Sequence, residues 1–153
     1  MKRVSFADMD CTIARTLEIV GEWWSFLIVK QALYGTTRFG DFQAELGIAR
    51  NVLSQRLKRL VEVGVLAHEP DQQGSKYPEY RLTQKGVELA TPLIAMMQWG
   101  DRWEPPADGP PIEVISAGSG APLGPLELHD QEGNRLGLGD LGYRRLRPKR
   151  AVR

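Results

Sequence analysis

The stretch that decides the fold is residues 48–69, Ile-Ala-Arg-Asn-Val-Leu-Ser-Gln-Arg-Leu-Lys-Arg-Leu-Val-Glu-Val-Gly-Val-Leu-Ala-His-Glu. Its apolar residues recur at helical spacing and predict a helix with one buried stripe, made of Leu53, Leu57, Leu60 and Val61. The opposite side carries only polar and cationic side chains, namely Arg50, Asn51, Ser54, Gln55, Lys58 and Arg59. The segment therefore predicts an amphipathic helix with a cationic outer face.

The outer face has the chemistry of a DNA-reading surface. Arg50, Arg56, Lys58 and Arg59 add four positive charges before the first acid, Glu62. Arginine, asparagine and glutamine side chains match base edges in the major groove, and Lys and Arg also bind phosphates. We expect Arg50, Asn51, Ser54 and Gln55 to face bases, and Lys58 and Arg59 to contact the backbone. A basic helix taken alone is also compatible with an ordinary solvated face.

The neighbouring segments favour the DNA-binding interpretation. A short helix over 38–46, a glycine turn at Gly47 and the longer basic helix form a helix-turn-helix, whose second helix enters the groove. Arg38, at the start of the short helix, joins the predicted DNA-binding set. After Gly64, strands over 65–69 and 78–82 flank a polar loop and predict a wing. The loop supplies the candidate DNA contacts Gln73, Ser75 and Lys76, although an ordinary surface hairpin would look similar.

Helices are also predicted on either side of this motif. Two, over 12–20 and 23–34, meet near Gly21, and the second is apolar nearly all round, as expected at the centre of a core or between subunits. Thr83 is a plausible N-cap for a helix over 84–103 that Pro92 should kink. The apolar width of that last helix predicts a homodimer interface of Leu93, Ile94, Met96, Met97, Trp99 and Trp103.

Composition limits the remaining possibilities. With 42% apolar and 25% charged residues, the 153-residue chain has the profile of a cored globular protein. The lone cysteine, Cys11, cannot form an intramolecular disulfide, and with His68 and His129 as the other soft ligands we expect no metal site and no cofactor. The sequence contains neither a membrane-spanning run nor a signal-peptide pattern, so we expect a cytoplasmic protein.

The predicted fold class is α+β, mainly α: a winged helix-turn-helix domain with a small C-terminal β extension. The winged helix-turn-helix DNA-binding and dimerisation domain should span 1–103, followed by a proline-rich connector over 104–111. A small β-rich module is expected over 112–143, from alternation at 112–114 and 126–128 and turn formers at 130–134. A basic tail, 144–153, completes the chain and could touch phosphate or remain solvated.

An enzyme is the less favoured alternative. Ser119 lies between two glycines, but no strand-to-helix pattern of a nucleophile elbow and no phosphate-loop lysine surrounds it. The two histidines have no evident shared partner. A winged-helix protein-interaction module that does not bind DNA stays open as the other alternative.

The chain resembles the HxlR-type branch of the MarR-like winged-helix transcription regulators. The matching features lie between residues 11 and 100, in this order: Cys11 with Ala14-Arg15-Thr16-Leu17, Val20-Gly21 before Trp24, Tyr34-Gly35 before Arg38-Phe39, Val52-Leu53-Ser54-Gln55-Arg56-Leu57, Gly64-Val65-Leu66, Glu79-Tyr80-Arg81-Leu82-Thr83, Lys85-Gly86, Pro92 and Trp99-Gly100. The resemblance implies a dimeric bacterial DNA-binding regulator with its recognition helix at Arg50 to Val63. Two departures are Pro78, where an aliphatic strand residue is expected, and the final 50 residues, which lie outside the shared domain.

Regulation is suggested by the same resemblance. In some relatives a lone N-terminal cysteine senses oxidants or electrophiles, and Cys11 occupies the matching position. Sensing requires a solvent-accessible thiolate, whereas a buried cysteine is inert. The identity of any small-molecule effector stays open.

Overall fold

The computed structural model describes residues 5–6, 9–70, 74 and 77–146. The chain divides into two compact units, residues 1–93 and 94–153. The first unit contains the helix-turn-helix and the base of the wing, and the second contains most of the last helix and the C-terminal extension. The four-part division expected from composition stays a prediction.

The helices of the first unit lie where the apolar periodicity places them. They are α1 (Thr12–Val20), α2 (Trp23–Leu33), α3 (Phe39–Leu46) and α4 (Arg50–Glu62). Gly47 follows α3 with a φ of 60°, a left-handed conformation that suits glycine. α3 begins one residue later than expected, because Arg38 has extended backbone angles and is its N-cap.

The end of α4 is fixed by a glycine turn. Gly64 has a φ of 71°. Its amide donates to Val61 O at 3.0 Å, and the Val65 amide donates to Leu60 O at 2.9 Å. This pair of bonds is a Schellman motif, which satisfies the last carbonyls of the helix. It also directs the chain into the first strand of the wing.

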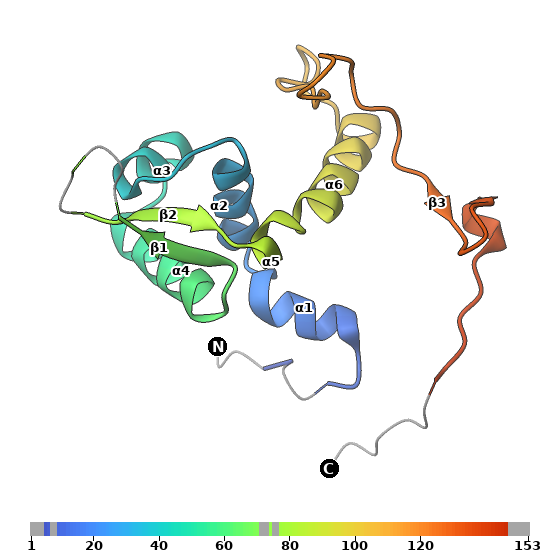
Figure 1. The fold of residues 1–153 in the computed structure, drawn as a ribbon, viewed down its shortest axis with the longest axis horizontal. Helices are drawn as coiled ribbons and strands as arrows, with labels where there is room; N and C mark the ends of the chain where they lie inside the picture. Colours follow the sequence, from blue (N-terminus) through green and yellow to red (C-terminus); the bar gives the residue numbers. More distant parts are fainter. Residues whose placement is uncertain (1–4, 7–8, 71–73, 75–76, 147–153) are drawn as a thin grey trace. The chain divides into compact units, whose positions relative to one another are not determined.

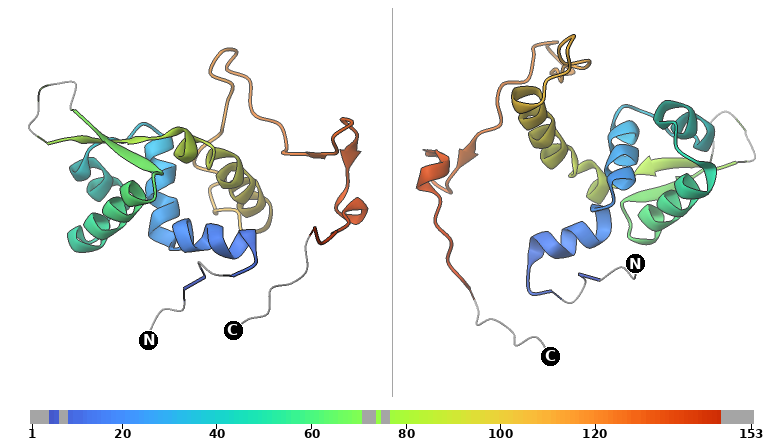
Figure 2. Two further views of the ribbon diagram at one scale, coloured as in Figure 1. Left: turned by 60° about the horizontal axis from the view of Figure 1, so that its bottom comes forward. Right: turned by 180° about the vertical axis from the view of Figure 1, so that it is seen from behind.

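The two wing strands are β1 (Leu66–Glu69) and β2 (Glu79–Leu82). They pair antiparallel, with Leu66 opposite Leu82 and Glu69 opposite Glu79. β2 starts one residue later than expected, since Pro78 has no N–H for the ladder and precedes the strand. Figures 1 and 2 show β1 and β2 side by side next to α4, and together with the helices they confirm the predicted winged helix-turn-helix.

One hydrophobic core holds these elements together. Its buried members come from α1, α2, α3, α4, the turn before α4 and the start of the wing: Val20, Ile28, Val29, Phe42, Ile48, Leu53, Leu57, Leu60, Val65 and Leu66. α2 lies at the centre, as its composition predicts, but it is not buried on every side. Trp23 and Leu27 are exposed.

The segment after the wing differs from the single kinked helix expected over 84–103. Thr83 is the predicted N-cap, since its Oγ1 accepts from Gly86 N at 3.2 Å. The short α5 (Gln84–Val87) follows, and α6 (Ala90–Trp103) begins after two turn residues. The break between α5 and α6 thus precedes Pro92. Pro92 lies in the first turn of α6, where a backbone N–H has no acceptor within the helix, so a proline there removes no helical hydrogen bond.

The C-terminal extension contains less strand than expected. Its elements are β3 (Leu128–His129), β4 (Arg135–Leu136) and the 3₁₀ turn η1 (Leu138–Asp140). The turn expected over 130–134 does join two antiparallel strands. Alternation at 112–114 does not produce a strand, because the only pairing nearby is a single bridge between Ile115 and Pro122. Among the helices of the described residues, none has the length and apolarity needed to cross a membrane.

Candidate nucleic-acid interface

The outer face of α4 is exposed as predicted. All six polar residues singled out on this side lie at the surface: Arg50, Asn51, Ser54, Gln55, Lys58 and Arg59. Leu53, Leu57 and Leu60 on the opposite side are completely buried. The packing of α4 against α2 and β1 therefore leaves the cationic face open to solvent.

Arg56 is an exception to the predicted cationic face. Its Nη2 lies 3.2 Å from Glu22 Oε2 at the start of α2, and both side chains are largely covered. Partly buried arginines with a carboxylate partner serve packing more than recognition. The positive charge of Arg56 therefore belongs to the α2–α4 contact and not to the outer face.

Lys58 and Arg59 share one acid at the C-terminal end of α4. Lys58 Nζ lies 4.0 Å from Glu62 Oε1, and Arg59 Nη1 lies 3.8 Å from Glu62 Oε2. Exposed pairs at this spacing are weak and are screened by salt. Two cations against one carboxylate leave a net positive charge at this end of the helix.

Arg50 is oriented by an aromatic ring. Its guanidinium carbon lies 5.2 Å from the centre of the Phe39 ring, at the start of α3. Such a cation–π contact restricts a flexible side chain without neutralising its charge. The contact joins the first residue of the second helix to the first residue of the preceding one.

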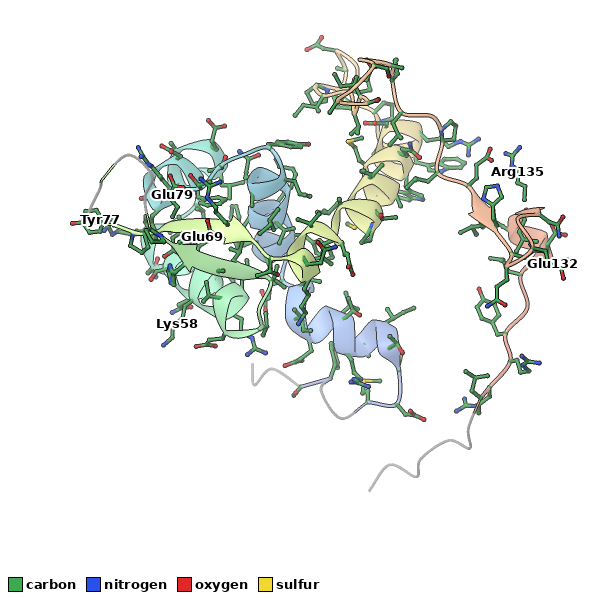
Figure 3. All side chains as sticks on the ribbon, viewed as in Figure 1. Lys58, Glu69, Tyr77, Glu79, Glu132 and Arg135 are labelled. Carbon is green, nitrogen blue, oxygen red and sulfur yellow. The ribbon has the colours of Figure 1, made fainter. Side chains whose placement is uncertain are left out.

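Arg38 lies against the base of the wing. Its Nε is 3.7 Å from Glu79 Oε1, and Arg81 Nη2 is 2.6 Å from Glu79 Oε2. Arg81 Nε also lies 3.3 Å from Glu69 Oε2. The four side chains therefore form a row of alternating charge, in the order Arg38, Glu79, Arg81 and Glu69. Figure 3 labels Glu69 and Glu79 on the paired strands and Lys58 on α4. The sequence patterns did not identify Glu79 as a site residue. Arg81, two residues later on the same face of the strand, was the one signal for an ion pair at Glu79.

The wing contacts expected from Gln73, Ser75 and Lys76 lie outside the described residues, as does most of the basic tail. Tyr77 and Pro78, at the start of the second wing arm, are exposed. Arg144 and Arg145, the described arginines of the tail, are also exposed.

The side chains expected at a dimer interface fall into two groups. Leu93 packs against the hydrophobic core of the first unit. Further along α6, Ile94 and Met97 are half-buried, whereas Met96, Trp99 and Trp103 are exposed by 54%, 62% and 63%. All residues of α6 are described and none of them is buried.

Cys11 is exposed and is the N-cap residue of α1. It therefore meets the access condition for chemistry at its sulfur, which a buried thiol would not. Two residues considered for an enzyme make local contacts: the His68 ring lies 4.8 Å from the Tyr80 ring in the wing, tilted by 49°, and Ser119 Oγ accepts from the amide of Ala121.

Comparison with known families identifies the domain. The sequence profile of the HxlR-like helix-turn-helix family matches residues 19–108, which include α2 to α6. The chain belongs to the HxlR-like helix-turn-helix family. An uncharacterized HTH-type transcriptional regulator of Mycobacterium tuberculosis, Rv3095, is 44% identical over 103 residues, which cover 67% of this chain and 65% of that protein. The uncharacterized HTH-type transcriptional regulator YvaP of Bacillus subtilis is 35% identical over 66% of this chain and 94% of its own length.

Solved structures show the same fold. The transcription-factor candidate PA1607 aligns with a TM-score of 0.84 and 39% identity over 93% of this chain and 99% of its own. The reduced form of the redox regulator HypR aligns with a TM-score of 0.55 and 26% identity over 60% of this chain and 92% of its own. A coverage of 93% cannot be reached within the helix-turn-helix domain. The likeness to PA1607 therefore includes the C-terminal extension, whereas that to HypR leaves two-fifths of the chain unmatched.

Proposed function

We propose that this HxlR-like protein is a sequence-specific DNA-binding transcription regulator. The observation that supports this most directly is the exposed face of α4, which carries Arg, Asn, Ser and Gln opposite a fully buried leucine stripe. Arg50, Asn51, Ser54 and Gln55 read base edges in the major groove. Lys58, Arg59 and Lys76 contact the DNA backbone. The remaining members of the DNA-binding set are Arg38, at the start of α3, and Gln73 and Ser75, which reach the backbone or the minor groove.

The proposed active form is a homodimer on an inverted-repeat operator in the cytoplasm. Met96, Trp99 and Trp103 present a large apolar surface on α6 of a single chain, and burial of such side chains in a partner is strongly favourable. A twofold dimer would place two copies of α4 on half-sites about one DNA turn apart.

Binding itself is tested with DNA from the region upstream of the protein's own gene, compared with a shuffled fragment of equal length. We expect roughly thousandfold tighter binding to the upstream fragment, with affinity falling steeply between about 50 and 200 mM salt. Equal affinity for both fragments, or none for either, favours the alternative of a protein-interaction module without DNA binding.

The division of roles within α4 has its own test. Arg50→Ala and Gln55→Ala should each reduce discrimination against mismatched operators by about 1–3 kcal/mol. Lys58→Ala should weaken binding to all DNA similarly and lower the salt slope by about one. The reverse pattern would contradict the assignment of Lys58 to the backbone.

The dimer interface is tested by sedimentation of Trp99→Ala and Trp103→Ala, alone and combined. Each exposed tryptophan truncation should weaken association by about 2 kcal/mol or more if the residue is an anchor of the interface. Val87→Ala, an exposed apolar truncation on α5 outside this set, is the matched control. A wild-type chain that sediments as a monomer would exclude the dimer.

Regulation through Cys11 is proposed from its exposure at the start of α1 and from the likeness to the redox regulator HypR. Mild peroxide or a quinone should weaken operator binding by the wild type and leave Cys11→Ser unaffected. An equal loss in both proteins would remove Cys11 from the regulatory mechanism.

A further inference from the structure

Glu79 is the most buried acidic side chain among the described residues of the wing. It is the first residue of β2, the residue is only 5% exposed, and it lies between two guanidinium groups. Arg81 approaches it at 2.6 Å and Arg38 at 3.7 Å. Because burial of a carboxylate is costly unless it is paired, the position of Glu79 depends on these two arginines.

The Glu79–Arg38 ion pair connects the wing to the helix-turn-helix. Arg38 is the N-cap of α3, and the backbone of the preceding residue, Thr37, accepts from Tyr80 N at 2.8 Å. β2 is therefore joined to the start of α3 by the Tyr80–Thr37 backbone hydrogen bond and by the ion pair of the adjacent residues Glu79 and Arg38. The Arg38 side chain is 40% exposed, so it reaches the surface of the protein.

From this arrangement we infer that Glu79 is a positioning residue for DNA binding: it holds the Arg38 guanidinium in the orientation in which Arg38 meets a DNA phosphate. The inference rests on the proposed DNA-binding function. A long arginine side chain loses rotamer freedom when it docks, and a partner that restricts it in the free protein reduces that loss. The same contact fixes the wing against α3, so both elements approach the duplex as one preassembled surface.

Two opposing effects follow from removing the negative charge of Glu79. A carboxylate near a phosphate repels it, so charge removal alone would strengthen binding. Loss of the ordered Arg38 would weaken binding. The sign of the change therefore separates a positioning role from a purely repulsive one.

Glu69 provides a matched control for charge. It lies directly opposite Glu79 in the β1–β2 register and has the same side chain. Its ion pair is with Arg81 Nε at 3.3 Å, and its side chain is 51% exposed. A change of Glu69 to Gln removes the same charge from the same sheet and leaves the Glu79–Arg38 pair in place.

The binding experiment uses the full chain and its upstream DNA, with anisotropy measured over a salt series for Glu79→Gln and Glu69→Gln. We expect Glu79→Gln to weaken binding about three- to fivefold, the order of one partly exposed ion pair, and Glu69→Gln to leave affinity unchanged or slightly stronger. In an Arg38→Lys background, which keeps the charge but not the planar fork, Glu79→Gln should cost less than about twofold. Equal effects of the two glutamine variants, or an undiminished loss in the Arg38→Lys background, would overturn the inference.

A second measurement does not depend on DNA. The Arg38 Nε–H bond vector, followed by nitrogen-15 NMR relaxation, should be more ordered in the wild type and Glu69→Gln than in Glu79→Gln, because the ion pair restricts the side chain. Equal order of Arg38 in all three proteins overturns the inference even if the protein binds DNA, whereas absence of specific binding by the wild type overturns the proposed function instead. If Glu79→Gln does not fold, Glu79→Asp replaces it in both measurements, because it keeps the charge and shortens the reach toward Arg38.

Discussion

The two units of this chain are stabilised in different ways. In the first, ten apolar side chains from the helices and the wing form one buried cluster. In the second, none of the described residues from 94 to 146 is buried. Several large apolar side chains there are among the most exposed in the molecule, including Leu138 at 83% and Tyr143 at 95%.

Local polar contacts replace a core in the second unit. The Gln98 side chain donates to Gly124 O at 3.0 Å and accepts from Leu126 N at 2.9 Å. Asp130 accepts from the amides of Glu132 and Asn134, and Asp140 accepts from Gly137 N. Because exposed hydrogen bonds contribute little net stability, the second unit of a lone chain should be far less stable than the first.

The largest expected effect contrasts two leucines. Leu57→Ala should lower the free energy of unfolding by about 2–5 kcal/mol, because Leu57 is completely buried in α4. Leu138→Ala should change it by less than about 0.5 kcal/mol, because that side chain contacts mainly solvent. Urea unfolding of the monomeric chain measures both. A large loss for Leu138→Ala would mean that the second unit has a core of its own.

A pair of glycines sharpens the same contrast. A Cβ on Gly86 would lie 2.2 Å from Val65 O, so Gly86→Ala forces the backbone apart and should cost about 1–3 kcal/mol. A Cβ on Gly100 in α6 would meet nothing within 4 Å in a single chain, so Gly100→Ala should stabilise the helix of the monomer by about 0.5–1 kcal/mol. Thermal unfolding distinguishes the two signs, and destabilisation by both variants would contradict the open surroundings of α6.

A smaller, local effect is expected at Gln98. Gln98→Ala removes two hydrogen bonds, each worth about 0.5–1.5 kcal/mol, and should speed amide exchange of Leu126 without changing the stability of the first unit. Gln84→Ala, which removes only a side-chain contact to Glu88, is the control. Unchanged exchange at Leu126 would show that other contacts hold this segment.

The smallest effect concerns the turn between β3 and β4. The side chain of Asn134, followed by its backbone amide, lowers the pKa of Asp130 below its ordinary value of 3.8. A depressed carboxyl pKa means that the contribution to turn stability is present above 3.8 and is lost as pH falls through the lower folded value. The protection of the Asn134 amide from exchange, relative to its intrinsic rate at each pH, should therefore fall in strong acid, and Asp130→Asn should abolish that change.

Local sequence patterns predicted most of the first unit. The leucine stripe of α4, the glycine ends of α3 and α4 and the Thr83 cap each depend on residues a few positions apart, so they can be read from spacing alone. The same reasoning found the polar face of α4. It could not anticipate that Arg56 turns to Glu22, 34 residues earlier, or that Arg38 lies beside Glu79.

The C-terminal extension was predicted less well, for a physical reason. Alternation over three residues, as at 112–114, specifies a strand only when a partner strand and a buried face support it. The described part of the extension has no buried face, and pairing there is limited to two short strands and one bridge. The turn formers at 130–134 succeeded because the hydrogen bonds of Asp130 are made within the turn itself.

The sequence by itself determined the order of helices and strands from α1 to β2, where those helices end and which side of α4 meets solvent, because helical period, capping and turn chemistry act over a few residues. Only the tertiary structure decided which cations remain on that surface and which are held by acids. Ion pairs such as Arg56–Glu22 and Arg38–Glu79 join residues distant in the chain, and they exist only after the core has packed α2, α4 and the wing together.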